Sequence, residues 1–517
     1  MMQNQNFAAI DIGTNSFHLI IVKIRENYTF ETISKEKEIV RLGEGFSGDK
    51  ISNDAYERGL NCLKRFQKLA EIHNAKIRAV ATSALREASN KWDFVLQVRN
   101  ELGINIEIVS GSEEARLIYY GILQGLPVFE KKILMIDIGG GSTELLVGCK
   151  GEVLFAQSLK LGAVRLTEQF FYEEPESKAK INQCKLYVES MITTNKKQIQ
   201  KLQPELVIGS SGTIQAIAQI VLEEKNSDAQ KSLNGFNFSS SLLQKTRNLL
   251  DSSDTLKKKL KIPGLDSRRA EIITAGSIIL EQIVDKFSIN SITVSEYALR
   301  EGIIYDTIRK QEGRETHHHD HDSIRFHSVV NVLNSFPYEK EHVETVTTLA
   351  LKIFDELITS HECDEDDREY LEAASMLHEI GLGISHSSHH KHSYYIIKNS
   401  ESMLGYNFNE IEIIAQIARY HRKSVPKSKH LEFQQLSINN QLLVKKLAGI
   451  LRIADGLDRS HQGNVESISC KIQKNLITFY LTPKQNADLH IEVWSAEQKK
   501  NLLEEVLNVK VEFIINA

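Results

Sequence analysis

The hydrophobic positions of residues 7–125 follow strand periodicity at first and helical periodicity later. Apolar residues cluster in four segments of strand length, each bounded by turn-forming residues. Between the third and fourth segments, residues 52–72 place apolar side chains at helical spacing, with Ser52 as an N-cap. The pattern therefore predicts the order strand, strand, strand, helix, strand, helix. The predicted strands cover residues 7–13, 17–24, 28–42 and 77–82.

The same order of elements returns between residues 131 and 305. Three apolar segments are again followed by a long amphipathic segment, at residues 177–202, and then by another strand-like run. A repeated order of strands and helices at domain-sized spacing predicts two related α/β domains. The predicted strands of this second domain cover residues 132–139, 143–149, 152–162 and 205–210.

A direct sequence repeat supports this duplication. The segment IDIGTNSFHLII, residues 10–21, returns without a gap as IDIGGGSTELLV, residues 136–147. Each copy is an apolar run, then Asp-x-Gly with small and hydroxyl residues, then a second apolar run, which predicts a β-hairpin. Glycines in the turn allow backbone N–H groups to close on an oxyanion, while the aspartate at the strand end faces the same space. Two such hairpins are expected to grip phosphate from opposite sides of a cleft.

The second half of the chain has a different pattern. A polar, histidine-rich stretch is followed by segments at helical spacing, such as residues 341–358 and 409–421. Near the C-terminus, residues 466–481 and 487–494 alternate apolar and polar side chains, and a helix and a last strand at 509–514 follow. The expected organisation is a first α/β domain at 1–125, a second at 126–308, a linker at 309–323, an all-α domain at 324–465 and a small α+β cap at 466–517.

Composition and charge narrow the class of protein. The 517 residues are 41% hydrophobic and 25% charged, as in ordinary globular proteins, and no apolar run reaches the roughly 20 residues of a membrane helix. The first residues enter a strand at once, and five cysteines lack CxxC spacing, so we expect a cytoplasmic protein without disulfides or a zinc ribbon. A net charge of −5 argues against nucleic acid and membrane surfaces as partners. Positive potential for a phosphate-rich ligand must therefore be concentrated inside a groove.

The ordered motifs resemble the exopolyphosphatase / guanosine pentaphosphate phosphatase (Ppx/GppA) family, a branch of the acetate-kinase, actin and sugar-kinase superfamily. SGSEEAR, within residues 108–121, is similar to the family's catalytic segment, and IDIGGGSTEL is similar to its second phosphate loop. The resemblance extends over nearly the whole chain. The segments that carry it are 10–21, 81–90, 108–121, 136–145, 207–218, 295–306, 376–397, 418–426 and 451–461.

The resemblance implies a fold and a function. The fold is α/β, with a duplicated ribonuclease-H-like module followed by an HD-like all-α domain and the α+β cap. The activity is hydrolysis of the terminal phosphoanhydride of inorganic polyphosphate, by metal-assisted attack of water that releases orthophosphate. Mg²⁺ or another divalent cation is the implied cofactor, and a homodimer the implied assembly. Guanosine pentaphosphate is an alternative substrate that no residue separates from polyphosphate; an actin-like ATP-binding protein, a sugar kinase and an HD-domain signalling phosphohydrolase are alternatives from other classes.

Hydrolysis of a phosphoanhydride needs a base for the attacking water and positive groups around the phosphoryl group. Glu114 is the candidate base, because the resemblance maps the family's catalytic glutamate onto the second Glu of SGSEEAR. Glu113 points about 100° away on a helix and is expected to cap it or to pair with Arg116. Arg86 is the expected guanidinium on the substrate, since its planar fork suits phosphate. Arg300 is expected either to play a similar part or to pair with Glu301.

Phosphate and metal ligands are expected at the two hairpins and at one strand-to-helix turn. Asp11 and Asp137 are the expected Mg²⁺ ligands, direct or through water. Glu144 is expected to be a further metal ligand or to orient the water, which also places it among the catalytic residues. The SSGT turn offers either an anion site or a helix cap. The expected phosphate-binding residues are Gly13, Thr14, Asn15, Ser16, Gly139, Gly140, Gly141, Ser142, Thr143, Ser211, Gly212 and Thr213.

The helical half resembles an HD-type phosphohydrolase domain through His342, His378 with Glu379, and Asp455. A catalytic HD site has an adjacent His-Asp pair, so the longer Glu379 favours a vestigial, non-catalytic site. Basic residues of this half are expected to guide a long polyanion. This polyanion track comprises His390, His392, Arg419, His421, Arg422 and Lys423. The tract HHHDH, residues 317–321, has the composition of a metal-binding cluster but is expected to bind adventitiously or not at all.

Overall fold

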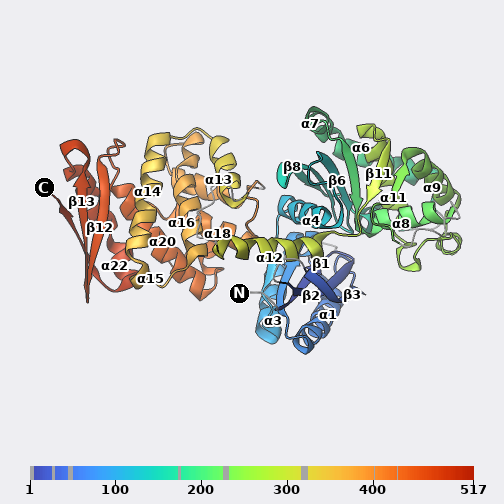
Figure 1. Ribbon diagram of the computed structural model, residues 1–517, viewed down its shortest axis with the longest axis horizontal. Coiled ribbons are helices and arrows are strands. Elements are labelled where there is room, and N and C mark those ends of the chain that lie inside the picture. Colours follow the sequence, from blue (N-terminus) through green and yellow to red (C-terminus); the bar gives the residue numbers. More distant parts are fainter. Residues whose placement is uncertain are drawn as a thin grey trace. The chain divides into compact units, whose positions relative to one another are not determined.

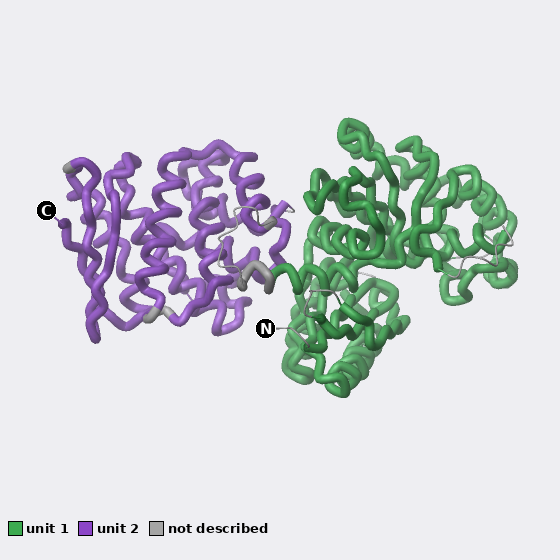
Figure 2. The backbone as a smooth tube through the Cα atoms, viewed as in Figure 1, with its two compact units in different colours: residues 1–319 green, residues 320–517 purple. Residues whose placement is uncertain are grey.

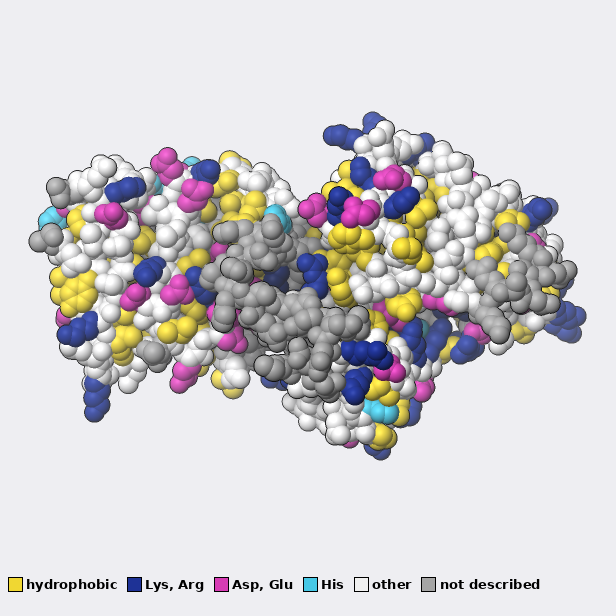
Figure 3. All heavy atoms as spheres, viewed as in Figure 1, with side chains coloured by type: hydrophobic (Ala, Val, Ile, Leu, Met, Phe, Trp, Pro, Cys, Tyr) yellow, Lys and Arg dark blue, Asp and Glu magenta, His cyan; other side chains and the backbone are white. Residues whose placement is uncertain are grey.

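The computed structural model describes residues 5–25, 30–44, 50–172, 176–224, 232–315, 324–400, 402–427 and 429–516. The chain divides into two compact units, unit 1 at residues 1–319 and unit 2 at residues 320–517 (Figures 1 and 2). In the described parts of the chain, no helix is both long enough and apolar enough to span a membrane. Acidic and basic side chains are interspersed over the visible face of each unit (Figure 3).

The first sheet of unit 1 has five strands: β1 (Asn6–Ile12), β2 (Ser16–Ile24), β3 (Phe30–Ile39), β4 (Lys76–Ala81) and β5 (Ile106–Ile108). Its helices are α1 (Asn53–Ile72), α2 (Ser83–Glu87), α3 (Lys91–Leu102) and α4 (Gly111–Gly125). The order in the sheet is β3-β2-β1-β4-β5. As the repeat predicts, β1 and β2 form an antiparallel hairpin, while β1 pairs in parallel with β4. Ser52 caps α1 by accepting a hydrogen bond from the N–H of Ala55.

The second sheet has six strands: β6 (Ile133–Ile138), β7 (Thr143–Cys149), β8 (Glu152–Leu159), β9 (Leu206–Ser210), β10 (Asn237–Ser239) and β11 (Ser291–Val294). Their order is β10-β11-β9-β6-β7-β8. Without the edge strand β10, this order repeats that of the first sheet, with β6 and β7 in the places of β1 and β2. The predicted duplication of the α/β domains is therefore present in the strand order.

Helices accompany the second sheet, and the last of them returns to the first. They are α5 (Ala163–Phe170), α6 (Lys178–Ile192), α7 (Lys196–Leu202), α8 (Ser211–Glu224), α9 (Ser240–Ser252), α10 (Leu256–Lys259), α11 (Ile273–Phe287) and α12 (Leu299–Glu315). Short 3₁₀ turns occur at Thr193–Asn195 and Ser267–Arg269, and the first interrupts the single helix expected at 177–202.

Helix α12 packs against α4, next to β1 (Figure 1). The helices approach so closely that a Cβ on Gly302 would lie 1.8 Å from the carbonyl oxygen of Leu117. Ile303 and Ile304 are fully buried in the core that α12 shares with α4. The helix extends to Glu315, past the expected linker start at 309; the rest of that linker, with the tract HHHDH, lies outside the described residues.

Unit 2 is mostly helical and ends in a small sheet. Its helices are α13 (Ile324–Asn334), α14 (Lys340–Glu356), α15 (Ile358–His361), α16 (Glu365–Leu377), α17 (His389–Lys398), α18 (Phe408–Arg419), α19 (Leu431–Gln434), α20 (Ile438–Gly456), α21 (His490–Lys499) and α22 (Asn501–Leu507), with 3₁₀ turns at Ile380–Gly383 and Lys484–Asn486. Its strands are β12 (Val465–Gln473), β13 (Leu476–Pro483) and β14 (Lys510–Ile515), in the order β12-β13-β14.

The alternating pattern of residues 487–494 does not form the strand that it suggests. These residues enter helix α21, which packs against α20 where a Cβ on Gly456 would lie 2.9 Å from the Cα of Ala496. Ala496 is fully buried in one core that also holds Phe479 of the sheet and Leu451 of α20. Tertiary packing thus overrides the local period of two, and the helices and the cap share one core.

Candidate active site

The two glycine-rich hairpin turns of unit 1 meet each other. In both, the glycine after Asp-x donates its N–H to a serine carbonyl: Gly13 to Ser16 at 3.2 Å, and Gly139 to Ser142 at 2.9 Å. A Cβ on Gly140 would lie 3.3 Å from the Cβ of Asn15 in the opposite turn. The two predicted phosphate loops therefore face each other, so closely that a side chain in place of Gly140 would contact the opposite loop.

Four carboxylates from both domains share the space beside these turns. They are Asp11 of β1, Glu114 of α4, Asp137 of β6 and Glu144 of β7. Burial raises the pKa of Asp11 to about 8, and the negative charges of Glu114 and Asp137 add to that shift. Burial also raises the pKa of Asp137 to about 7, although a hydrogen bond from Ser210 acts in the opposite direction. The sequence repeat thus brings Asp11 and Asp137 together rather than placing them on separate surfaces.

Glu144 is the most deeply placed of the four carboxylates. Its side chain accepts a hydrogen bond from the Ser158 hydroxyl at 2.7 Å, across neighbouring strands β7 and β8. Burial, followed by the charges of Glu114 and Asp137, holds the pKa of Glu144 well above its usual range. Ser158 carries no recognisable motif, so its place in the site follows only from the structure.

The start of helix α4 positions Glu114. Ser110 caps the helix by accepting a hydrogen bond from the N–H of Glu113 at 3.1 Å, which sets Glu114 in the first turn. Arg86 donates to Glu114 Oε2 at 2.9 Å and to the carbonyl of Val109 at 3.1 Å. Burial raises the pKa of Glu114, against the nearby charge of Arg86. The candidate base and the candidate substrate arginine are therefore in direct contact.

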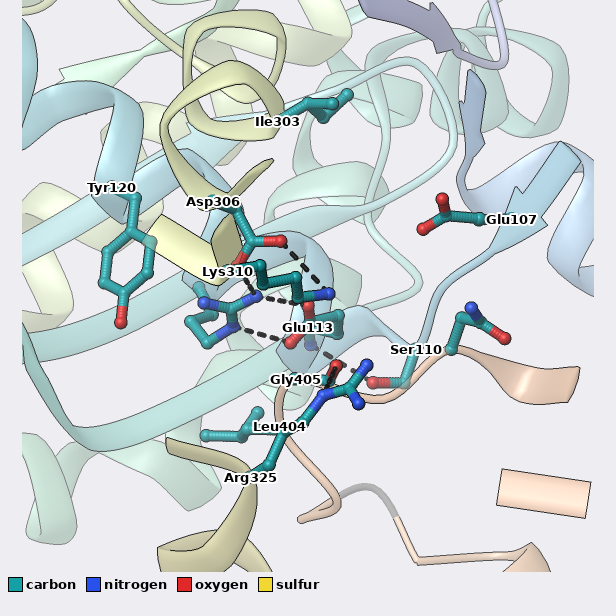
Figure 4. A network of polar contacts seen from close by, with 12 residues as sticks. Glu107, Ser110, Glu113, Tyr120, Ile303, Asp306, Lys310, Arg325, Leu404 and Gly405 are labelled. Atoms are coloured by element: carbon teal, nitrogen blue, oxygen red, sulfur yellow. Dashed lines mark hydrogen bonds and ion pairs between the residues drawn. The ribbon is translucent and has the colours of Figure 1, made fainter. Parts of the chain in front are cut away.

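Glu113 faces away from this site, as the helical spacing predicts. Its carboxylate accepts two hydrogen bonds from Arg116, at 2.6 and 2.7 Å, inside the packed core. Arg116 also donates to Asp306 of α12 at 2.7 Å, and Figure 4 shows Glu113 and Asp306 converging from their two helices. The predicted pairing of Glu113 with Arg116 is confirmed, and it joins α4 to α12.

Arg269, a cation that no sequence motif identifies, also interacts electrostatically with this group of carboxylates. A Cβ on Gly212 would lie 1.6 Å from Arg269 Nη2, so this guanidinium rests directly on the SSGT turn. Burial and the charges of Arg269 and Arg268 lower the pKa of Lys37 to about 8. Arg300 lies 3.7 Å from Glu301, and its charge also lowers the pKa of Asp11, so both readings of this arginine have a structural basis.

These cations come from separate parts of the sequence. Lys37 lies within the alternating strand β3, whereas Arg269 lies in a 3₁₀ turn between α10 and α11. His18 of β2 is half-buried near them, and desolvation followed by the charge of Arg300 holds its pKa well below the usual range. In the sequence, Lys37 is indicated only by the charged, alternating pattern of β3, and such a pattern is a weak signal for a binding residue.

The SSGT turn also stabilises the second hairpin. Ser210 donates its hydroxyl hydrogen to Asp137, and the N–H of Ile138 donates to the Ser211 hydroxyl at 3.3 Å. Ser211 has φ of 80°, which places a non-glycine residue in the left-handed region. The turn therefore bonds to the residues that precede the second phosphate loop, and Arg269 covers Gly212.

The predicted polyanion track lies in unit 2 and is charged only in part. Burial lowers the pKa of His390 to about 4 and holds the pKa of His421 well below its usual range, so both imidazoles are neutral near pH 7. Arg419 lies over the ring of Tyr394 and pairs with Glu432, while Lys423 is exposed. His392 and Arg422 are half-buried. Positive charge in the track therefore rests on Arg419, Arg422 and Lys423, because the buried histidines do not supply it.

Comparisons with known proteins agree with this geometry. A sequence model of the Ppx/GppA phosphatase family matches residues 20–311, more than half of the chain. A model of Ppx/GppA phosphatase domain III matches residues 324–505.

Solved structures give the same assignment. The crystal structure of an exopolyphosphatase from Cytophaga hutchinsonii ATCC 33406 is 31% identical, covers 59% of this chain and 98% of its own, and has a TM-score of 0.56. The crystal structure of the Aquifex aeolicus member of the Ppx/GppA family is 27% identical, covers 59% of this chain and 98% of its own, and has a TM-score of 0.52. Matches over most of both units, with paired glycine loops and a buried glutamate at the start of α4, lead to one conclusion: the chain belongs to the Ppx/GppA phosphatase family.

Proposed function

We propose that this protein is an exopolyphosphatase, which removes the terminal phosphate of inorganic polyphosphate with the help of Mg²⁺. The observation that carries the proposal is the group of three buried carboxylates, Glu114, Asp137 and Glu144, with the half-buried Asp11, beside two facing glycine turns. Such a site offers N–H and hydroxyl donors to phosphate oxygens and acidic groups to a cation and a water molecule.

The cations around the site suit a substrate with several linked phosphates. Lys37, Arg269 and Arg300 interact electrostatically with the carboxylates or with one another. Their position in an otherwise acidic protein concentrates positive potential where the net charge of −5 would not supply it. We assign to them the phosphates next to the one that is cleaved.

The carboxylates fit a hard divalent cation. Burial and mutual repulsion raise the pKa values of Asp11, Asp137 and Glu144, and a bound cation would remove much of that electrostatic cost. These three residues would hold Mg²⁺, whose oxygen-rich coordination they match. When bound, the ion would neutralise phosphate oxygens in the transition state.

Glu114 is assigned as the base. Arg86 donates to its Oε2, and the carboxylate accepts a proton from the attacking water. The water oxygen forms a bond to the terminal phosphorus, while the bond from that phosphorus to the bridging oxygen breaks. The products are orthophosphate and a chain shortened by one phosphate. Arg86 reaches the phosphoryl group from the side of the water, where its guanidinium stabilises the developing negative charge.

Guanosine pentaphosphate is the second candidate substrate, and one observation favours it. The Arg269 guanidinium lies over the SSGT turn, and a planar cation above a polar turn is suited to a base or a ribose phosphate. The same cleavage chemistry would then remove the 5′-terminal phosphate of a nucleotide. Replacing Arg269 with Gln should weaken guanosine pentaphosphate hydrolysis more than hydrolysis of a short polyphosphate chain.

The decisive experiment measures phosphate release from long-chain polyphosphate, guanosine pentaphosphate and ATP under one set of conditions with Mg²⁺. An exopolyphosphatase should show its highest kcat/KM on polyphosphate, and Glu114→Gln should abolish most of that rate. A preference for guanosine pentaphosphate would transfer the assignment to the second candidate. Turnover of ATP alone, or activity unchanged by Glu114→Gln, would overturn both.

A further inference from the structure

Unit 2 gathers a second set of metal-binding side chains that the proposed phosphatase chemistry does not use. They are His342 at the start of α14, His378 and Glu379 after α16, His389 at the start of α17, His421 after α18 and Asp455 of α20. All except Asp455 are buried, and the segments that supply them lie far apart in the sequence. Among the residues that the structure describes, His342, His378 and Glu379 form a group of possible ligand atoms lying within 4.8 Å of one another.

Three of these imidazoles are held in one orientation by hydrogen bonds on the opposite side of the ring. His378 donates its Nδ1–H to the carbonyl of Ser375 at 2.6 Å, and His421 donates its own to the carbonyl of Ala418 at 2.6 Å. The Nδ1 of His342 lies 2.7 Å from Asp458 Oδ2. A carbonyl oxygen only accepts, so the Nδ1 of His378 and of His421 carries the proton, and the Nε2 of each of these two rings presents a lone pair. The Asp458 carboxylate fixes the ring of His342 from its Nδ1 side. Acceptors behind the ring fix metal-ligating histidines in this manner.

The atoms that face the centre have no other partner. In the described part of the chain, His342 Nε2, His378 Nε2 and Glu379 Oε2 are buried without a hydrogen bond. Asp455 Oδ1 lies 3.7 Å from His342 Nε2 and 4.0 Å from His378 Nε2, while its Oδ2 pairs with Lys499. Ligands about 2.0–2.2 Å from a metal ion stand roughly 3.3 Å apart in a tetrahedral site. To close around one ion, the 4.0 Å separation would shorten by about 0.7 Å, and separations of up to 4.8 Å within the group by about 1.5 Å.

The second oxygen of Glu379 extends the arrangement. Its Oε2 lies 3.8 Å from His342 Nε2, whereas its Oε1 lies 3.9 Å from His389 Nε2. His389 Nε2 is in turn 3.2 Å from His421 Nε2, and Arg422 donates to His389 Nδ1 at 3.2 Å. The longer side chain of glutamate thus reaches between two groups of histidines. The residue that weakens the resemblance to a catalytic HD pair is placed to bridge two ions.

We propose that unit 2 binds a divalent transition-metal ion between His342, His378, Glu379 and Asp455. His389 and His421 provide a second metal position on the other side of the Glu379 carboxylate, where the ion displaces the proton of the hydrogen bond between the two Nε2 atoms. Neutral imidazole with carboxylate favours Mn²⁺, Fe²⁺, Co²⁺ or Zn²⁺ over Mg²⁺, which prefers an all-oxygen shell. The inference is independent of the cleft in unit 1 and would stand if the proposed phosphatase substrate were wrong.

The test measures metal content of the full-length protein, stripped with a chelator, loaded separately with Co²⁺, Mn²⁺ or Zn²⁺ and desalted. The wild type should retain about two ions per chain, the occupancy of a bridged two-ion site. Co²⁺ should add visible absorption bands of an imidazole-bound ion. Glu379→Gln preserves shape and should remove most of the metal, and His378→Ala should do the same. Asp458→Asn, a positioning variant, should lower the affinity about 10–100-fold.

Matched controls separate this site from other histidines. His386→Ala changes an exposed residue of the same region and should leave the metal content unchanged. Serine replacements at His317, His318, His319 and His321 remove the histidines of the linker tract. Metal that persists in Glu379→Gln but disappears with the tract would overturn the proposal. Retention of one ion, unchanged by His389→Ala, would overturn the second position, and binding of Mg²⁺ in preference to Co²⁺ would overturn the assignment of metal class.

Discussion

The carboxylates in the cleft of unit 1 and the histidine group of unit 2 present different kinds of ligand atoms to a cation. In the cleft, Asp11, Asp137 and Glu144 present oxygen atoms only, and burial with mutual repulsion raises their pKa values. In unit 2, His342 and His378 present nitrogen atoms whose direction is fixed by acceptors behind each ring. The first site holds carboxylates that repel one another, whereas the second offers directed lone pairs.

This difference predicts which ion each region binds and how tightly it binds that ion. A cluster of buried carboxylates binds a hard ion that arrives with its own phosphate ligands, as Mg²⁺ does with a polyphosphate chain. Oriented imidazoles bind a transition metal tightly without help from a substrate. The comparison therefore predicts weak, substrate-linked metal binding in unit 1 and tight, resident binding in unit 2. Four experiments can break or sharpen it.

The largest effect is expected from neighbouring glutamates of α4. Glu114→Gln removes the proposed base while keeping shape, so turnover should fall roughly 10²- to 10⁴-fold with little change in KM. Glu113→Gln instead removes a partner of buried Arg116, and should lower the free energy of unfolding by ~3 kcal/mol. Turnover per folded molecule should then stay close to that of the wild type. Steady-state kinetics and chemical denaturation of both variants measure these effects. A large loss of turnover in Glu113→Gln, with near-normal turnover in Glu114→Gln, would make Glu113 the base.

The next effect concerns the metal requirement of the cleft. Asp137→Asn keeps the hydrogen bond from Ser210 but removes a negative charge, so the Mg²⁺ concentration for half-maximal activity should rise about tenfold or more. The content of the transition metal proposed for unit 2 should be unchanged in the same variant. An unaltered Mg²⁺ titration would refute Asp137 as a ligand. A loss of the resident metal would show that the two regions share an ion, against the comparison.

A smaller effect is expected in the pH dependence of stability. Folding raises the pKa of Asp11 from 3.8 to about 8 and that of Asp137 from 3.8 to about 7. Between these values the folded state holds more protons than the unfolded state, so metal-free stability should fall as pH rises from about 5 to 8. A cation replaces those protons, so the stabilisation by Mg²⁺ should grow over the same range. Thermal unfolding with and without Mg²⁺ measures both slopes, and Asp11→Asn should flatten them.

Local signals explain how much of the cleft could be predicted from the sequence. The two hairpins are each encoded within twelve residues, by apolar runs around an Asp-x-Gly turn, so residues 10–21 and 136–147 identify themselves. Glu114 is located by a cap and a helix start that are adjacent in sequence. Arg269 and Ser158 were missed because each reaches the site by tertiary packing and neither carries a motif.

Burial explains why the charge and part of the secondary structure of unit 2 could not be predicted from its sequence. His421 and His390 read as members of a basic surface because histidines, lysines and arginines are neighbours in that part of the chain. The fold turns these two histidines inward, where their pKa values fall, and leaves Lys423 outside. Residues 487–494 show the same limit, since their alternation is overruled by packing on α20.

The smallest effect tests what remains of the polyanion track. Lys423 of the track is exposed, as are Lys427 and Lys429 close to it in the sequence, so a triple change to Gln removes positive charge without disturbing packing or the histidine group. If these lysines help to retain long polyphosphate between cuts, KM for long chains should rise a few-fold, while KM for a short chain stays constant. The difference should shrink at high salt, where the charges are already screened. The length distribution of products on a gel is the sharper measurement, because a weaker track releases intermediates before degradation is complete. Complete degradation without intermediates in the triple variant would remove these lysines from substrate handling, and the positive charge of unit 2 would have to be tested at Arg419 instead.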